Sequence, residues 1–192
     1  MFSFGNHKLP KTTSTFNMTT ARDCPSKKLG TCNAVVNRHC YCYAKNPELR
    51  FPKVLSYRLK QQKWWRECTP ETFVKRLLDC KQDFNKLRFS EAGDFPNQDS
   101  VNKAEEIAKL LWTDKDIVTY CHTSRSDLDY SGLVFLRVRG SGFIKPGLWG
   151  TTNIITKSSD LKKYKDKYIC PGNCKYCHYC MDEQGLVLFL LH

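Results

Sequence analysis

Apolar residues in the second half of the chain recur in short runs, which are separated by segments with helical spacing. The runs that predict strands span residues 86–90, 116–121, 133–138, 153–156 and 186–191. Between the first two runs, residues 99–112 carry apolar side chains on one helix face: Val101, Ala104, Ile107, Ala108 and Leu111. Strands that alternate with helices are typical of parallel βα units. The pattern therefore predicts an α/β fold.

The first half of the chain predicts helices. Residues 52–65 have a helical pattern with Pro52 near the first turn. The tripeptide Thr69-Pro70-Glu71 combines a capping residue, a proline at the first helical position and an early acid. Further along, a charged helix is expected near residues 158–167, and the glycines and proline of 140–150 predict a flexible connection. We expect one α/β domain over residues 1–192 and consider an incomplete βα barrel as its architecture.

Composition narrows the class of protein. The chain has 192 residues, of which 41% are hydrophobic and 12% aromatic, as expected of one folded domain. No apolar run approaches the roughly 20 residues of a membrane span, and the start Met1–Asn6 lacks a secretory pattern. We therefore expect no membrane insertion and a cytoplasmic location. In a reducing compartment, the eleven cysteines are expected to be metal ligands or buried thiols rather than disulfides.

Four cysteines crowd one short stretch near the C-terminus. Cys170, Cys174, Cys177 and Cys180 are separated by three, two and two residues. This spacing is close to a ferredoxin-type run with its longer gap first, so an iron–sulfur cluster is the favoured ligand. Zinc is the alternative, although structural zinc sites usually use two well-separated cysteine pairs. The sequence predicts a metal centre within a C-terminal cysteine loop over residues 168–182.

A second cysteine group lies in an expected N-terminal loop over residues 24–44 and comprises Cys24, Cys32, Cys40 and Cys42. Neighbouring glycine, proline and asparagine favour irregular backbone, which can turn thiolates inward. Because alternate residues of an extended chain point in opposite directions, only one of Cys40 and Cys42 is expected to face a cluster. For the cysteines in expected helices or strands, packing is the favoured role: Cys68, Cys80 and Cys121.

The chain is strongly basic, with a formal net charge of +12. Such a charge attracts nucleic acid or an acidic protein partner, although solvated lysines are an equally good explanation. Trp64 and Trp65 stand beside Lys63 and Arg66 and could stack on bases, but tandem tryptophans in a helix are more often core anchors. The alternative to a redox protein is thus a zinc- or cluster-stabilised binding module without catalysis.

Several short motifs together resemble one protein family. These motifs are Cys24-Pro25, Cys32, Cys42-Tyr43-Ala44-Lys45, Phe51-Pro52-Lys53-Val54, Arg58, the segment 87–95, the Ile107-Ala108 step and the C-terminal cysteine cluster. In this combination the chain resembles a family of bacteriophage proteins called gene product eighty-eight. The resemblance spans most of residues 24–180. It implies a phage-encoded or viral protein that is expressed in the host cytoplasm.

That family is in turn similar to the radical S-adenosylmethionine superfamily. The likeness implies a partial βα barrel with a 4Fe-4S cluster on Cys24, Cys32 and Cys42, and an auxiliary cluster on the four C-terminal cysteines. It also implies that the segment from Glu91 to Asp94 contacts S-adenosylmethionine, although a capped loop explains this segment as well. The chain departs from the superfamily because seven residues, rather than three and two, separate Cys24, Cys32 and Cys40.

Overall fold

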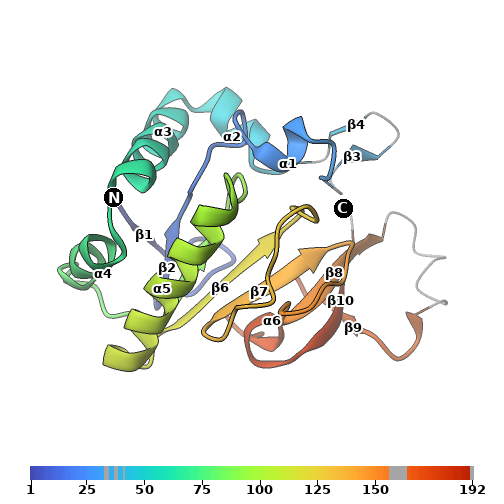
Figure 1. The fold of residues 1–192 in the computed structure, drawn as a ribbon. Coiled ribbons are helices and arrows are strands. Elements are labelled where there is room, and N and C mark those ends of the chain that lie inside the picture. The colour runs from blue at the N-terminus through green and yellow to red at the C-terminus, as the bar shows by residue number, and fades with distance from the viewer. Residues whose placement is uncertain (33–34, 37–38, 41, 156–163, 191–192) are drawn as a thin grey trace.

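The computed structural model describes residues 1–32, 35–36, 39–40, 42–155 and 164–190 (Figure 1). Within these ranges the strands are β1 (Ser3–Phe4), β2 (Thr13–Phe16), β3 (Val35–Val36), β4 (His39–Cys40), β5 (Lys86–Phe89), β6 (Val118–Thr123), β7 (Leu136–Ser141), β8 (Gly150–Ile155), β9 (Tyr168–Ile169) and β10 (Gly185–Leu190). The helices are α1 (Pro25–Lys28), α2 (Lys45–Arg50), α3 (Pro52–Glu67), α4 (Pro70–Leu78), α5 (Gln98–Lys115) and α6 (Tyr179–Asp182).

Eight of these strands form one sheet in the order β1-β2-β5-β6-β7-β8-β10-β9. Strand β1 is antiparallel to β2, and every other pair of neighbours in this sheet is parallel. From β2 to β8, the order across the sheet follows the order along the chain, as it does when successive crossovers keep one direction. The expected α/β fold is confirmed.

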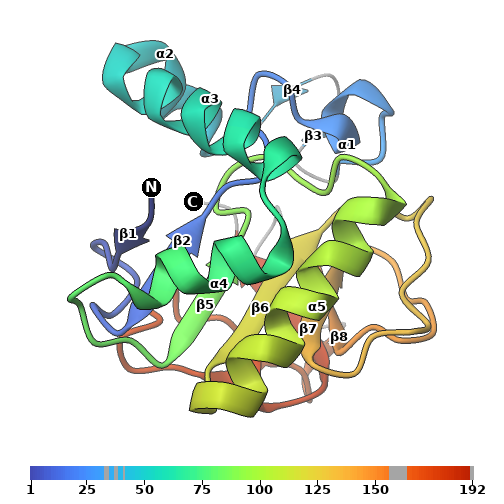
Figure 2. The ribbon, with the colours of Figure 1, turned by 60° about the vertical axis from the view of Figure 1, so that its left-hand side comes forward.

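One face of the sheet, here called the outer face, is covered by α3, α4 and α5, and Figure 2 shows α4 and α5 lying across the strands. The core there centres on packed aromatic rings, with Phe73 stacked on Trp64 and edge-on to Phe16. Trp65 is only 2% exposed, and its indole N–H donates to Ser100 Oγ at 3.1 Å. Trp65 is therefore a core anchor, which confirms that interpretation for it, and Trp64 is partly buried between Phe73 and Arg76.

The opposite face, here called the inner face, is polar and cationic. Strand alternation places Phe89 and Cys121 among the buried apolar residues of the outer face, so Arg88 and Tyr120, a register pair, point the other way. His122 and Arg139 form a second pair on this face. Because a parallel sheet is normally covered on both faces, these polar residues need a cover of their own. The C-terminal segment around α6 supplies it, behind the sheet in Figure 1.

The predicted elements match the observed ones to within a few residues, most closely at α3, α4, α5, β5 and β10. The expected cap is present, since Thr69 accepts a hydrogen bond from the Thr72 N–H. The expected helix near 158–167 lies mostly outside the described residues, and the expected cysteine loops contain short elements, including α1 and α6. Strands β6, β7 and β8 follow one another without intervening helices, because residues 124–135 and 142–149 form hydrogen-bonded turns. No helix in the described ranges is long and apolar enough to cross a bilayer.

Candidate metal centres at two cysteine groups

The N-terminal cysteines lie beyond the carboxyl end of β2. Cys24, Cys32 and Cys42 line one small cavity of about 20 Å³, together with Lys27 and Lys45. Burial raises the pKa of the Cys24 thiol to about 12, and the nearby Cys32 adds to this shift. The structure thus brings three of the four predicted N-terminal cysteines to one cavity. The side chain of Cys40 lies outside the described residues.

A buried ion pair holds both ends of this cysteine segment. The carboxylate of Glu48 accepts hydrogen bonds from the backbone N–H groups of Ala21, at 2.7 Å, and Arg22, at 3.0 Å. Arg58 forms an ion pair with Glu48 at 2.9 Å and also donates to the carbonyl of Ala44 at 3.0 Å. Because Ala21 precedes Cys24 and Ala44 follows Cys42, this one pair fixes the two chain segments that bring the thiols together.

The predicted cosubstrate residues lie at the same edge of the sheet. Asp94 is buried, and its carboxylate accepts from the hydroxyls of Ser26 and Thr123, both at 2.6 Å. It also accepts from the backbone N–H groups of Ser124 and Phe95, both at 2.8 Å. Burial raises the pKa of Asp94, while these hydrogen bonds favour its charged form. Asp94 therefore joins α1 to the end of β6, and both of its oxygens are engaged.

The turn that presents Asp94 requires glycine. Gly93 has a φ of +74°, and a Cβ atom there would meet Thr19 Oγ1 at 2.1 Å. Glu91, at the start of this turn, accepts a hydrogen bond from Asn6 Nδ2 at 2.5 Å, and the hydroxyl of Tyr43 donates to its backbone carbonyl. Since Tyr43 follows Cys42 directly, the Glu91–Asp94 turn packs against the cysteine segment at both ends.

The C-terminal cysteines lie between β9 and β10, on the inner face. The backbone N–H of Cys170 donates to the carbonyl of Leu188 at 2.8 Å, which fixes the start of the run. Tyr168 lies with its hydroxyl 2.8 Å from Cys177 Sγ, and this contact raises the pKa of Tyr168 to about 12. Burial raises the pKa of Cys180 to about 11, with a contribution from the other three cysteines of the run. These contacts fix the start of the run on β10 and Cys177 beside β9.

Three cations of the inner face hold this loop. Arg139 is 1% exposed and donates to the carbonyls of Cys180 and Gly185, both at 2.7 Å, and to that of Glu183. Arg137 donates to the carbonyl of Met181, just beyond Cys180. The third cation is Lys86, whose Nζ lies 3.3 Å from His178 Nδ1. Arg139 and Arg137 thus fix the backbone at Cys180, the last cysteine of the run.

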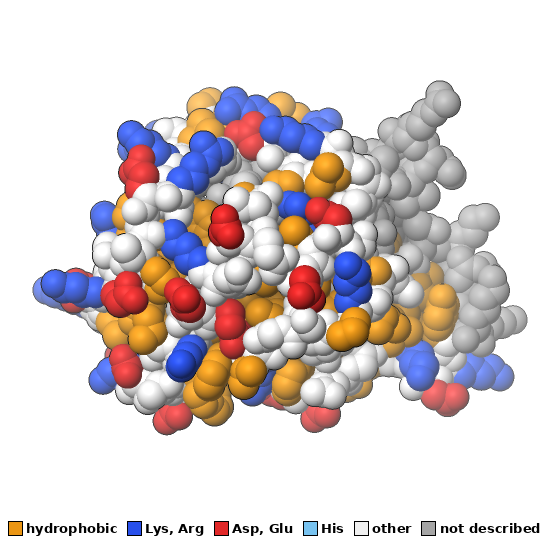
Figure 3. All heavy atoms as spheres, in the orientation of Figure 1, with side chains coloured by type: hydrophobic (Ala, Val, Ile, Leu, Met, Phe, Trp, Pro, Cys, Tyr) orange, Lys and Arg blue, Asp and Glu red, His pale blue; other side chains and the backbone are white. Residues whose placement is uncertain are grey.

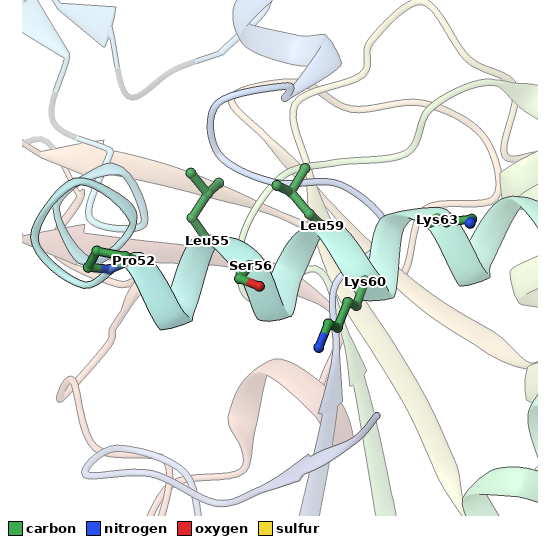
Figure 4. Close-up of a pocket in the computed structure, with 6 residues that line it drawn as sticks. All are labelled: Pro52, Leu55, Ser56, Leu59, Lys60 and Lys63. Carbon is green, nitrogen blue, oxygen red and sulfur yellow. The ribbon is translucent and has the colours of Figure 1, made fainter.

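Among the described side chains, neither cysteine group is drawn together around a single ion. Within the described residues, no three His, Cys, Asp or Glu side chains are placed to hold one metal ion. A larger hollow of about 430 Å³ runs along α3, and its walls are Pro52, Leu55, Ser56, Leu59, Lys60 and Lys63 (Figure 4). These walls contain no thiol, carboxylate or imidazole, so the hollow offers no donor set for iron or zinc.

Comparison with known proteins places the chain in a family. A family model described as Gene product 88 matches residues 1–130. The chain belongs to the Gene product 88 family. The match confirms the resemblance to this phage gene-product family; it includes Cys24, Cys32 and Cys42 and ends before the C-terminal cysteines. No curated protein and no solved structure shows a detectable match to the chain.

Some residues that hold the two cysteine groups in place were not predicted from the sequence. Glu48 and Arg58 look like surface charges of amphipathic helices, and only their burial reveals the ion pair. Arg137 and Arg139 carried a usable signal, because two arginines alternate with apolar residues in a strand. That alternation indicates a cationic face within the fold.

The Glu48–Arg58 pair yields a stability prediction. The substitution Arg58→Met leaves the carboxylate of Glu48 buried without its partner, and we expect the free energy of unfolding to fall by about 3–5 kcal/mol. The control is Arg22→Met, because the Arg22 side chain is 59% exposed beside Asp23 and its loss should cost about 0–1 kcal/mol. Urea denaturation measures both. Equal effects of the two substitutions would contradict the role given to the buried pair.

His122 yields a prediction about pH. Burial lowers its pKa to about 3, with further lowering by Arg88 and Arg139. The unfolded chain takes up this proton near pH 6.5 and the folded chain only near pH 3, so stability should fall as the pH falls between these values. The contribution of one such proton is at most about 1.4 kcal/mol per pH unit.

The substitution His122→Gln should therefore flatten the dependence of the unfolding free energy on pH between about 6.5 and 3, as measured by urea denaturation across a pH series. The matched control is His7→Gln, which changes an exposed histidine and should leave the slope as it is in the unaltered protein. An unchanged slope in the His122 variant would show that this imidazole takes up its proton at its ordinary pH.

Proposed function

We propose that this protein binds iron–sulfur clusters in a fold related to that of radical S-adenosylmethionine enzymes. Cys170, Cys174, Cys177 and Cys180 would hold a closed 4Fe-4S cluster. Cys24, Cys32 and Cys42 would hold a second cluster with one iron free of protein ligands. The observation that carries the proposal is the placement of the thiols, since each group is gathered in one region and fixed there by buried ionic or backbone contacts.

The donor sets suit this cofactor. The cavity at Cys24 contains three thiols and two lysines, and thiolate ligands select iron–sulfur clusters, zinc or copper(I) rather than magnesium or calcium. The two lysines would offset the negative charge of a thiolate-bound cluster. On the inner face, the buried Nε of Arg88 has no hydrogen-bond partner in the described residues, so this region also has an unmatched positive group.

The arrangement of the sheet supports a site at the N-terminal cysteines. In parallel α/β folds, ligands bind beyond the carboxyl ends of the strands. The cysteine segment after β2, the Glu91–Asp94 turn after β5 and Ser124 after β6 all lie at this edge and share hydrogen bonds. Strands that follow chain order from β2 to β8 are also what a partial barrel requires.

In this proposal the cluster with a free iron would supply redox chemistry on a bound cosubstrate, for which S-adenosylmethionine is the candidate. The chain's own residues have simpler roles. Asp94 holds α1, and with it Cys24, against the end of β6. Glu48 and Arg58 fix the approach to Cys24 and the exit from Cys42, and Lys27 and Lys45 line the cavity. We place this activity in a reducing compartment such as the host cytoplasm.

The alternative is a binding module in which zinc or a closed cluster only stabilises the fold, with nucleic acid or an acidic protein as its partner. The net charge of +12 favours it. On the face drawn in Figure 3, however, acidic and basic side chains are interspersed rather than gathered into a basic patch. The burial of Trp65 also removes its aromatic stacking surface.

Cluster binding is tested by iron and acid-labile sulfide analysis of protein prepared without oxygen. We expect about four iron and four sulfide per cluster, and about eight of each when both groups are loaded. A Cys170→Ser, Cys174→Ser double variant should lose about half of both, as should a Cys24→Ser, Cys32→Ser double variant. The control variant Cys80→Ser should retain all of the iron and sulfide. Stoichiometric zinc without sulfide would contradict the proposal.

The proposed cosubstrate is tested by incubating the loaded protein with S-adenosylmethionine and a strong reductant. We expect 5′-deoxyadenosine to form and to be abolished by the Cys24→Ser, Cys32→Ser variant, because only the N-terminal cluster would have a free iron. Chromatography measures the product. If no 5′-deoxyadenosine exceeds background while iron and sulfide are both present, the protein binds clusters but does not use this cosubstrate.

A further inference from the structure

Arg88 is a cation on the inner face without a matching charge. It lies in the middle of β5, in register with Thr15 on β2 and Tyr120 on β6. Its Nε is buried and has no hydrogen-bond partner in the described residues, and no ion pair of the described residues includes it. Its recorded hydrogen bond runs from Nη2 to the Tyr43 hydroxyl, at a long 3.5 Å.

This arrangement is costly unless something completes it. A guanidinium has five N–H donors and stays charged at any ordinary pH. A charge that is shielded from water without a counter-charge destabilises the folded protein, and a buried donor left unpaired adds to that loss. Arg139, two strands away, shows the usual solution, because its N–H groups are directed to carbonyls of the C-terminal loop. Arg88 lacks such a set of acceptors.

The carboxylate of Glu91, whose charge acts on Arg88, is engaged elsewhere. Glu91 accepts a hydrogen bond from Asn6 Nδ2, and none of the ion pairs among the described residues joins it to Arg88. The tyrosines beside Arg88 are neutral at ordinary pH, because a phenol keeps its proton up to about pH 10 and burial raises the pKa of Tyr120 further. Neither tyrosine can therefore supply the missing negative charge.

The remaining source of negative charge is the C-terminal cysteine loop. On the same face and strand as Arg88, Lys86 contacts His178 of this loop. On β7, Arg137 and Arg139 hold the backbone at Met181 and Cys180. Arg88 is two residues beyond Lys86 on β5, so its side chain lies on the face that this loop covers, and its charge opposes the burial that raises the pKa of Cys174. Cys174 would become an anion when it binds a metal.

We infer that Arg88 is the counter-charge of the C-terminal cysteine site and supplies its buried, unpartnered N–H to the metal-bound thiolates of that site. This inference rests on the proposed cluster. This role of Arg88 differs from that of Arg139, which positions the loop by binding the carbonyls of the loop. A positive group beside a cluster stabilises its reduced form, because reduction adds one negative charge. Arg88 therefore raises the reduction potential of the C-terminal cluster.

The test measures the reduction potential of the C-terminal cluster by dithionite titration followed with electron paramagnetic resonance. The signal of this cluster is the one that persists in the Cys24→Ser, Cys32→Ser variant. We compare Arg88→Met with Arg88→Lys, which keeps the charge. The control Arg76→Met removes an equal but exposed charge over Trp64, on the other face of the sheet.

Arg88→Met should lower the ratio of reduced to oxidised cluster at least tenfold at a fixed potential, which is about 59 mV for one electron. Arg88→Lys should recover most of this loss, and Arg76→Met should show none. Equal iron, sulfide and circular dichroism establish that the variants load and fold alike. An unchanged potential in Arg88→Met overturns the inference and leaves the proposed cluster standing. If the unaltered protein takes up no iron and sulfide, the inference about Arg88 and the proposed cluster binding both fail.

If Arg88→Met does not fold, the unaltered protein still decides the question. Pulsed paramagnetic resonance of protein labelled with ¹⁵N-arginine should show nitrogen coupled to the reduced cluster, and the coupling should weaken in labelled Arg88→Lys. An identical coupling in the two proteins would assign it to Arg139 and overturn the inference.

Discussion

The guanidinium of Arg139 is buried on the inner face of the sheet, and its N–H groups are directed to three carbonyls of one loop. The sheet leaves room for it at Gly150, where a Cβ atom would meet Arg139 Nη1 at 2.5 Å. A parallel sheet has to be covered on both faces, and its outer face is already occupied by α3, α4 and α5. Arg139 holds the segment from α6 to the start of β10 against the sheet. The cysteine segment that precedes it therefore covers the inner face.

The N-terminal cysteines depend on the same sheet in a different way. They lie at the carboxyl edge and are held by two carboxylates, Glu48 and Asp94, whose oxygens take backbone and hydroxyl donors from several segments. Tyr43 connects this edge to the inner face, since it follows Cys42 and contacts both Glu91 and Arg88. The two cysteine groups are far apart in sequence, but one strand, β5, has residues next to both.

The sequence predicted the elements whose patterns are local. The apolar spacing of α5 and the cap at Thr69 depend on neighbouring residues only, so both were found. The general alternation of strands and helices does not hold between β6, β7 and β8, where the connecting segments form hydrogen-bonded turns. One of these connections, over residues 140–150, was predicted from its glycines and proline. Strand β2 was missed because its residues, Thr13–Phe16, are mostly polar and become buried only by pairing with β1 and β5.

The cysteines of the two candidate sites can be picked out from the sequence, whereas the contacts that hold them cannot. Cysteine spacing singles out Cys170, Cys174, Cys177 and Cys180 as candidate ligands, and the family match covers Cys24, Cys32 and Cys42. The Glu48–Arg58 pair is recognisable only from its burial in the fold. Arg139 contacts backbone carbonyls of a distant segment, and every residue type has a carbonyl, so the sequence does not reveal its partners. Such contacts become visible only when the fold brings the segments together.

The most direct test of the account is X-ray absorption at the iron and zinc edges on one sample of protein purified without oxygen. Clusters on the two cysteine groups predict iron with a shell of sulfur neighbours and a second shell of iron, and little zinc. Zinc surrounded by four sulfurs, with no iron above background, would contradict the account and would leave the cysteines with a structural role.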